Sequence, residues 1–163
     1  SGGSTSLYNA VYIALKELAK VKASSADDVR RQAIVVLSDG EDTSSVVPFD
    51  LVLDEAKRSE VMVYAIGLRP KEAATTKGWK EAEFVLRTIA QETGGRSYLV
   101  EAPTQLGAIY GQFADELANQ DTLGYTSTNV KRDGSWRRIA LRVSRPDTLA
   151  RTKTGYFAPT TTR

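Results

Sequence analysis

Ala33-Ile-Val-Val-Leu-Ser-Asp-Gly-Glu-Asp-Thr43 is the stretch that decides the fold, because an apolar run ends there in a cluster of acids and hydroxyls. Residues 33–37 predict a strand buried on both faces, as in a parallel sheet. The polar residues 38–43 follow at the carboxyl end of that strand. Open α/β sheets bind ligands at this edge, in the crevice beyond the strand ends. Carboxylate and hydroxyl oxygens there suit a hard cation such as Mg²⁺ or Ca²⁺.

Composition excludes several classes of function. The chain has 163 residues, enough for one domain with a sizeable core, and it contains neither Cys nor His. Disulfides, thiolate or imidazole zinc sites, cysteine nucleophiles and Ser-His-Asp triads are therefore excluded. No run approaches the ~20 apolar residues of a membrane span, so we expect none.

Charge divides the chain into two parts. Residues 1–121 carry 13 Lys and Arg against 18 Asp and Glu, whereas residues 122–163 carry 9 against 2. We expect residues 1–121 to form an α/β unit. The basic residues 122–163 are expected to form an antiparallel extension that packs on it.

Alternating apolar patterns define the elements of the first part. Apolar spacing predicts three strands, over 33–38, 61–68 and 97–100. It predicts four helices, over about 6–22, 48–60, 79–93 and 103–119. Strands separated by helices imply right-handed crossovers and a parallel sheet flanked by helices. Gly94-Gly95 is expected to cap the third helix, because a left-handed residue at that place favours glycine.

The basic part follows a different pattern. Residues 122–130 and 136–143 are strand-like, and Asp133-Gly134 between them is a hairpin signal. We therefore expect these two segments to pair as a hairpin, to which residues 149–158 add a third strand.

Four segments of the first part match one known family when they are taken together. They are Gly2-Gly-Ser-Thr-Ser-Leu-Tyr-Asn-Ala10, Ile34-Val-Val-Leu-Ser-Asp-Gly-Glu-Asp42, Val63-Tyr-Ala-Ile-Gly67 and Ala90-Gln-Glu-Thr-Gly-Gly95. As a set they resemble the von Willebrand factor type A domain. The resemblance implies a Rossmann-like α/β fold, of which this chain would lack the N-terminal part.

Segments at and within the basic part resemble one bacterial subgroup of this family. The segments Gln120-Asp-Thr-Leu-Gly-Tyr125, Gly134-Ser-Trp-Arg-Arg-Ile139 and Gly155-Tyr-Phe157 resemble a bacterial subgroup known from acidobacterial exported proteins. This likeness implies an extracytoplasmic location, in the periplasm, in the medium or at the cell surface.

The family resemblance implies a metal-ion-dependent adhesion site. Carried over to this chain, Thr5 would supply a hydroxyl ligand and Asp39 a carboxylate to Mg²⁺, Ca²⁺ or Mn²⁺. Supplementary ligands would come from Ser4, Ser6, Glu41 and Asp42. An acidic residue of a protein partner would complete the coordination shell, so the resemblance implies a protein-interaction or adhesion module rather than an enzyme.

One part of the family pattern is missing. The family's Asp-x-Ser-x-Ser loop has no counterpart here, and by the same pattern about three strands and two helices would precede Ser1. We therefore expect this chain to bind metal weakly, with water filling the remaining positions. Strand 33–38 would become an open apolar edge, and such edges pair with other chains. We expect a second copy, a rearranged segment or a separate N-terminal half to cover it.

Other readings of these residues stay open. Ser4 and Ser6 also suit turn and N-cap hydroxyls, and Glu41 and Asp42 suit solvated loop acids. Asn9 stands where the family commonly has Asp. A Mg²⁺-dependent hydrolase using Asp39, Glu41 and Asp42 is the first alternative function, and a structural module with a vestigial metal site is the second. We expect no nucleic acid partner, because the alternating arginines suit a solvated face.

Overall fold

The computed structural model describes residues 5–21, 31–38, 42–68 and 77–161. Two groups of secondary structure follow one another along the chain. The first runs α1 (Leu7–Lys20), β1 (Ala33–Ser38), α2 (Phe49–Arg58), β2 (Met62–Leu68), α3 (Lys77–Thr93), β3 (Ser97–Val100), a 3₁₀ turn (Pro103–Gln105) and α4 (Leu106–Ala118). The second consists of β4 (Trp136–Arg138) and β5 (Gly155–Phe157). No helix among the described residues is long and apolar enough to cross a membrane.

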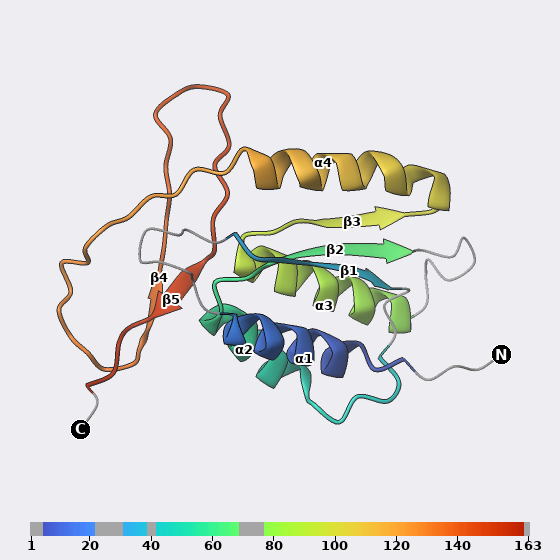
Figure 1. Ribbon diagram of the computed structural model, residues 1–163, viewed down its shortest axis with the longest axis horizontal. Coiled ribbons are helices and arrows are strands. Elements are labelled where there is room, and N and C mark those ends of the chain that lie inside the picture. Colours follow the sequence, from blue (N-terminus) through green and yellow to red (C-terminus); the bar gives the residue numbers. More distant parts are fainter. Residues whose placement is uncertain (1–4, 22–30, 39–41, 69–76, 162–163) are drawn as a thin grey trace.

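The three strands of the first group form a parallel sheet in the order β1-β2-β3. Helices α1, α2 and α3 cover one face and α4 covers the other, as Figure 1 shows. The expected α/β fold, a parallel sheet flanked by helices, is confirmed. Each predicted strand and helix of this part is present, with ends that differ by a few residues.

Strand β2 lies in the middle of the core because both of its faces are apolar. Val63 and Ala65 face the cluster built with α1, α2 and α3, whereas Tyr64 and Ile66 face α4. All four side chains are at most 1% exposed. Their burial fixes the register of the sheet, since a slip by one residue would exchange the two faces.

Strand β1 is buried on one face only, which corrects the expectation that both faces are covered. Ile34 and Val36 pack against the α1–α3 cluster, whereas Val35 and Leu37 are 40% and 44% exposed. The reason is that the cluster beneath α4 includes Ala33 at the start of β1 but neither Val35 nor Leu37. Within the described residues no strand pairs with the outer side of β1, so it is an edge strand as expected.

The end of α3 requires two glycines. Gly94 has φ +82°, the left-handed conformation expected of a helix cap. At Gly95 a Cβ atom would lie 2.0 Å from the carbonyl oxygen of Val63, so only glycine allows this approach of β2.

The pairing in the basic extension differs from the predicted hairpin. Strand β4 pairs antiparallel with β5, and residues 122–130 form no strand. Asp133-Gly134 does turn the chain, since the Ser135 N–H donates to Asp133 Oδ1 at 3.0 Å, but this turn joins no paired strands.

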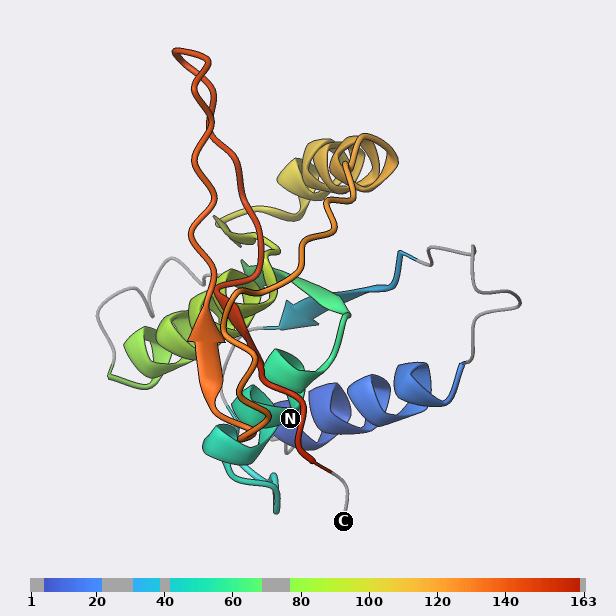
Figure 2. The same ribbon diagram turned by 90° about the vertical axis from the view of Figure 1, so that its left-hand side faces the viewer.

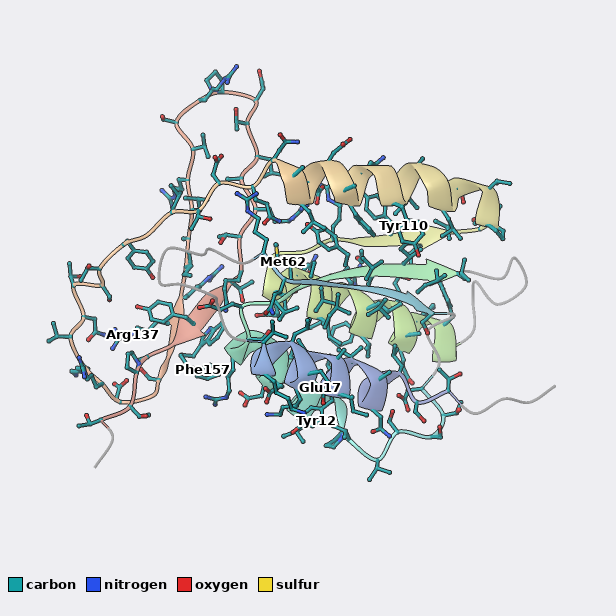
Figure 3. All side chains as sticks on the ribbon, viewed as in Figure 1. Tyr12, Glu17, Met62, Tyr110, Arg137 and Phe157 are labelled. Atoms are coloured by element: carbon teal, nitrogen blue, oxygen red, sulfur yellow. The ribbon has the colours of Figure 1, made fainter. Side chains whose placement is uncertain are left out.

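The Arg137 side chain explains the difference. Its guanidinium group donates to the carbonyl oxygens of Asn129 and Lys131, so a side chain binds this segment in place of a backbone ladder. Figure 3 shows Arg137 between β4 and the neighbouring loop. Residues 139–154 then extend away from β4 and β5 as an arm, seen in Figure 2.

Aromatic rings attach the extension to α2. Lys57 Nζ lies 4.4 Å from the centre of the Trp136 ring, and Arg58 Cζ lies 3.9 Å from the centre of the Phe157 ring. Each cation–π contact stabilises the attachment by ~0.5–2 kcal/mol. Two aromatic residues of the extension therefore contact the C-terminal end of α2.

Two cations of the extension, Arg151 and Lys153, lie at helix C-termini, and we call them the basic clamp. Arg151 Nε donates to the carbonyl oxygen of Gly94 at 2.9 Å, and its guanidinium group also pairs with Glu116 of α4. Lys153 Nζ donates to the carbonyl oxygen of Ser59 at 2.8 Å. Helix C-termini carry the negative end of the backbone dipole, so cations at this place stabilise the helices. Burial lowers the pKa of Lys153.

Candidate functional site

The candidate site lies at the carboxyl edge of the sheet, where α1 begins and β1 ends. In Figure 1 the three strands point toward the edge from which α1, α3 and α4 start. Thr5 and Ser6 precede α1, and the loop 42–47 connects β1 to α2. The two segments are about 38 residues apart along the chain and lie in direct contact.

Backbone hydrogen bonds hold Thr5 against this loop. The Thr5 carbonyl oxygen accepts from the N–H groups of Thr43 and Ser44, at 2.9 and 3.2 Å. The Thr5 N–H in turn donates to Thr43 Oγ1 at 2.9 Å. Ser6 Oγ and Ser44 Oγ lie 2.7 Å apart and share a hydrogen bond. Thr5 therefore has a fixed position relative to the loop that follows β1.

Asp42 binds the first turn of α1 with its carboxylate. Oδ2 accepts from the N–H of Tyr8 at 2.8 Å and from Ser45 Oγ at 2.6 Å, and Oδ1 accepts from the Ser45 N–H at 2.9 Å. A carboxylate at a helix N-terminus satisfies a free N–H and interacts favourably with the helix dipole. Asp42 therefore caps a helix that lies earlier in the chain.

Asn9 completes the connection and was not singled out as a site residue by the sequence. Its side-chain Oδ1 accepts from the N–H groups of Val46 and Val47, at 3.2 and 3.0 Å. Its backbone N–H donates to Ser45 Oγ at 3.0 Å. The sequence does not reveal this role, because Asn9 and the loop that it anchors are far apart along the chain and meet only in the folded structure. The sequence marks Asn9 solely as a departure from the family's Asp.

The environment shifts two pKa values in this cluster. Partial burial alone would raise the pKa of Asp42, but hydrogen bonds from Ser45 and from the N–H of Tyr8 hold it below its usual value. Burial and the nearby charges of Asp42 and Glu81 raise the pKa of the Tyr8 phenol. Asp42 is therefore a charged acceptor and Tyr8 a neutral phenol at neutral pH.

The structure brings together three of the six predicted site residues. Thr5, Ser6 and Asp42 lie in this cluster. Ser4, Asp39 and Glu41 lie outside the described residues. Ser6 occupies the N-cap position of α1, yet its side chain makes no capping bond. Within the described ranges, no group of three or more acidic side chains gathers where it could hold a metal ion.

A cavity of about 1060 Å³ lies at the opposite, amino edge of the sheet. It lies between the C-terminal end of α4, the start of β2 and the arm 139–154. Three of its charged groups are engaged with one another, since Glu116 pairs with both Arg96 and Arg151. Figure 3 labels Met62, which lines the cavity where β2 starts. This cavity is a contact region between the extension and the first part.

Comparison with known proteins gives one match. The family model of the von Willebrand factor type A domain matches residues 1–112. No curated protein and no solved structure matches the chain.

Proposed function

Because this chain belongs to the von Willebrand factor type A family, we propose that it is an adhesion module whose protein partner docks at the carboxyl edge of the sheet. Domains of this family are generally interaction modules rather than enzymes. The observation that carries the proposal is the attachment of Thr5 to the loop after β1 through hydrogen bonds with Thr43 and Ser44. This attachment holds a threonine beside the end of β1, the strand that Asp39 directly follows.

We assign to this edge a divalent cation, Mg²⁺ or alternatively Ca²⁺ or Mn²⁺. Thr5 would supply a hydroxyl and Asp39 a carboxylate, with Ser4, Ser6 and Glu41 as supplementary oxygen donors. These hard oxygen donors fit the ligand preference of such ions. When bound, the cation supplies an open position for a carboxylate of the partner, and the surrounding loops supply contact area.

Asp42 has a different role in this proposal. Its two carboxylate oxygens already accept three hydrogen bonds, from Tyr8 and Ser45. We therefore assign Asp42 to holding the loop in place. The hydrolase alternative, in which Asp39, Glu41 and Asp42 orient a water molecule, is disfavoured for the same reason.

We further propose that strand β1 pairs with a strand outside this chain. The exposed Val35 and Leu37 and the open outer edge of β1 support this proposal. The added strand would come from a second copy or from a separate N-terminal half of the domain. An extracytoplasmic location is part of the proposal and rests on the subgroup resemblance alone.

Paramagnetic broadening by Mn²⁺ tests the metal site even when binding is weak. In a titration of the isotope-labelled chain followed by NMR, we expect the amide signals of Thr5, Ser6, Thr43 and Ser44 to broaden first. Excess Mg²⁺ should restore them, because both ions compete for the same oxygens.

Two variants make the test specific. Asp39→Asn should abolish the selective broadening, whereas Asp121→Asn, which removes an exposed acid that lines the cavity at the amino edge, should leave it unchanged. Broadening spread evenly over all acidic segments, or unchanged in Asp39→Asn, would refute the metal site and favour a structural module with a vestigial one.

A further inference from the structure

A shallow pocket of about 400 Å³ lies beside the candidate site, between α1 and α3. Its lining consists of Tyr8, Lys80, Glu81, Phe84 and Val85. We call it the Tyr8–Phe84 pocket. A volume of this size accommodates one large side chain of a partner.

Tyr8 belongs both to the pocket and to the candidate site. Its ring lines the pocket, while its backbone N–H donates to Asp42. The next residue, Asn9, fixes the loop that presents Val46, whose side chain is 89% exposed. One turn of α1 therefore positions both the pocket and the loop 42–47. A partner that binds the pocket is thereby placed next to this loop.

The pocket is aromatic and accessible. The rings of Tyr8 and Phe49 lie 5.8 Å apart, and those of Phe49 and Phe84 lie 6.5 Å apart. Phe49 is partly buried against the core, whereas Phe84 is 55% exposed. An exposed ring supported from behind by packed rings is a typical anchor at protein interfaces.

The charged residues at the rim of the Tyr8–Phe84 pocket indicate which group of a partner binds there. Burial, Asp42 and Glu81 together raise the pKa of the Tyr8 phenol, so the charge of Glu81 is felt at the Tyr8 side of the pocket. Lys80 also lines the pocket and forms no ion pair within the part of the chain that the structure describes. A carboxylate of a partner is therefore the complementary group at this rim.

We propose that the Tyr8–Phe84 pocket receives a large apolar side chain of the protein partner, and that an acidic residue next to it on the partner pairs with Lys80. This inference rests on the proposed function, because it assigns the partner of the same edge. It adds a recognition element that needs no metal ion. The occupant is an exposed segment in which Leu, Ile, Phe, Tyr or Trp neighbours Asp or Glu.

A library of random displayed peptides, selected on the wild-type chain in the presence of EDTA, tests the pocket. EDTA removes divalent ions, so any selected peptide binds without the metal site. We expect enrichment of peptides that place a large apolar residue beside Asp or Glu. Affinities are then measured with the synthesised peptides.

Three variants locate the binding. Phe84→Ser should weaken the selected peptides by about tenfold or more, as expected for an anchor contact. Lys80→Glu should weaken them as well, and less so for peptides in which the acid is replaced by its amide. Ile13→Ser is the matched control, because Ile13 is 58% exposed on α1 and does not line the pocket.

The results of the peptide selection either support or overturn the Tyr8–Phe84 pocket as a binding site. Absence of enrichment, or peptides that bind Phe84→Ser as tightly as wild type, would overturn the pocket. If the peptides require Phe84 and Lys80, the pocket stands, and the cation-dependent part of the proposed function is decided separately by the Mn²⁺ titration of wild type and Asp39→Asn. Peptides that bind Phe84→Ser and Lys80→Glu as tightly as wild type, together with Mn²⁺ broadening that persists in Asp39→Asn, would refute both proposals.

Discussion

The carboxylate of Asp42 accepts a hydrogen bond from the backbone N–H of Tyr8 at 2.8 Å, so a loop after β1 caps the helix before β1. Ser45 adds a second cap from the same loop, because its Oγ accepts from the N–H of Asn9. The local N-cap residue, Ser6, makes no side-chain capping bond. The start of α1 therefore depends on the loop 42–47, and neither is in place without the other.

Removing this carboxylate should destabilise the fold. We expect Asp42→Ala to lower the free energy of unfolding by about 1–3 kcal/mol, because it leaves the N–H groups of Tyr8 and Ser45 without their acceptor. Urea denaturation followed by circular dichroism measures the change. Asp121→Ala removes an exposed acid outside the helices and should change stability by less than about 0.5 kcal/mol. Equal effects of the two substitutions would argue against the cap.

The same carboxylate makes stability depend on pH. The folded pKa of Asp42 lies below its unfolded value, which is about 3.9. Its stabilising effect is therefore complete above the unfolded pKa and is lost as the pH falls through the folded pKa. We expect the stability difference between wild type and Asp42→Asn to be constant above about pH 5 and to shrink below about pH 4. Denaturation curves of both proteins from pH 7 to pH 2 measure it, and a difference that grows on acidification would contradict the cap.

Gly95 has no room for a side chain. We expect Gly95→Ala to cost about 3 kcal/mol or more, because the new Cβ would lie 2.0 Å from the backbone oxygen of Val63. Thermal unfolding gives the comparison. Gly107→Ala on α4 meets nothing within 4 Å and should be neutral or stabilise the fold by up to about 1 kcal/mol. A tolerated Gly95→Ala would mean that β2 and the end of α3 do not approach as closely as described.

The outer edge of β1, which is unpaired among the described residues, predicts self-association of the chain. We expect light scattering during size exclusion to give a dimer or larger species, and Val35→Lys to shift it toward monomer, because a charge on an edge strand opposes pairing. Ile13→Lys places the same charge on an exposed position of α1 and should leave the mass unchanged. A monomeric wild type would show that the edge tolerates solvent, and the proposed pairing of β1 would then be wrong.

The α/β part could be predicted because local pattern and tertiary environment agree there. Residues 33–38 and 62–68 are apolar runs long enough for a strand and too short for most helices, and both form strands. Gly94-Gly95 marks the end of α3 because a left-handed residue at a helix end favours glycine, and Gly94 adopts this conformation. The uneven burial of β1 depends on where α4 lies, which no pattern within β1 encodes.

The extension and the loop network could not be predicted in the same way. Asp133-Gly134 does form a turn, but Arg137 binds the carbonyl groups of residues 129 and 131 and prevents the expected ladder. The roles of Asp42 and Asn9 depend on contacts between segments more than 30 residues apart. Such contacts follow from the assembled fold, so the sequence identifies the residue types at the edge without their partners.

The basic clamp has a consequence for how the chain is made. Lys153 reaches back 94 residues to the carbonyl oxygen of Ser59, and Arg151 reaches back 57 residues to that of Gly94. During translation the sheet and its helices therefore leave the ribosome before the cations that secure their ends. A chain stalled before residue 151 would carry α2 and α3 without the cations that bind their C-terminal carbonyl groups, so these two helix ends are secured only after the helices themselves have been made.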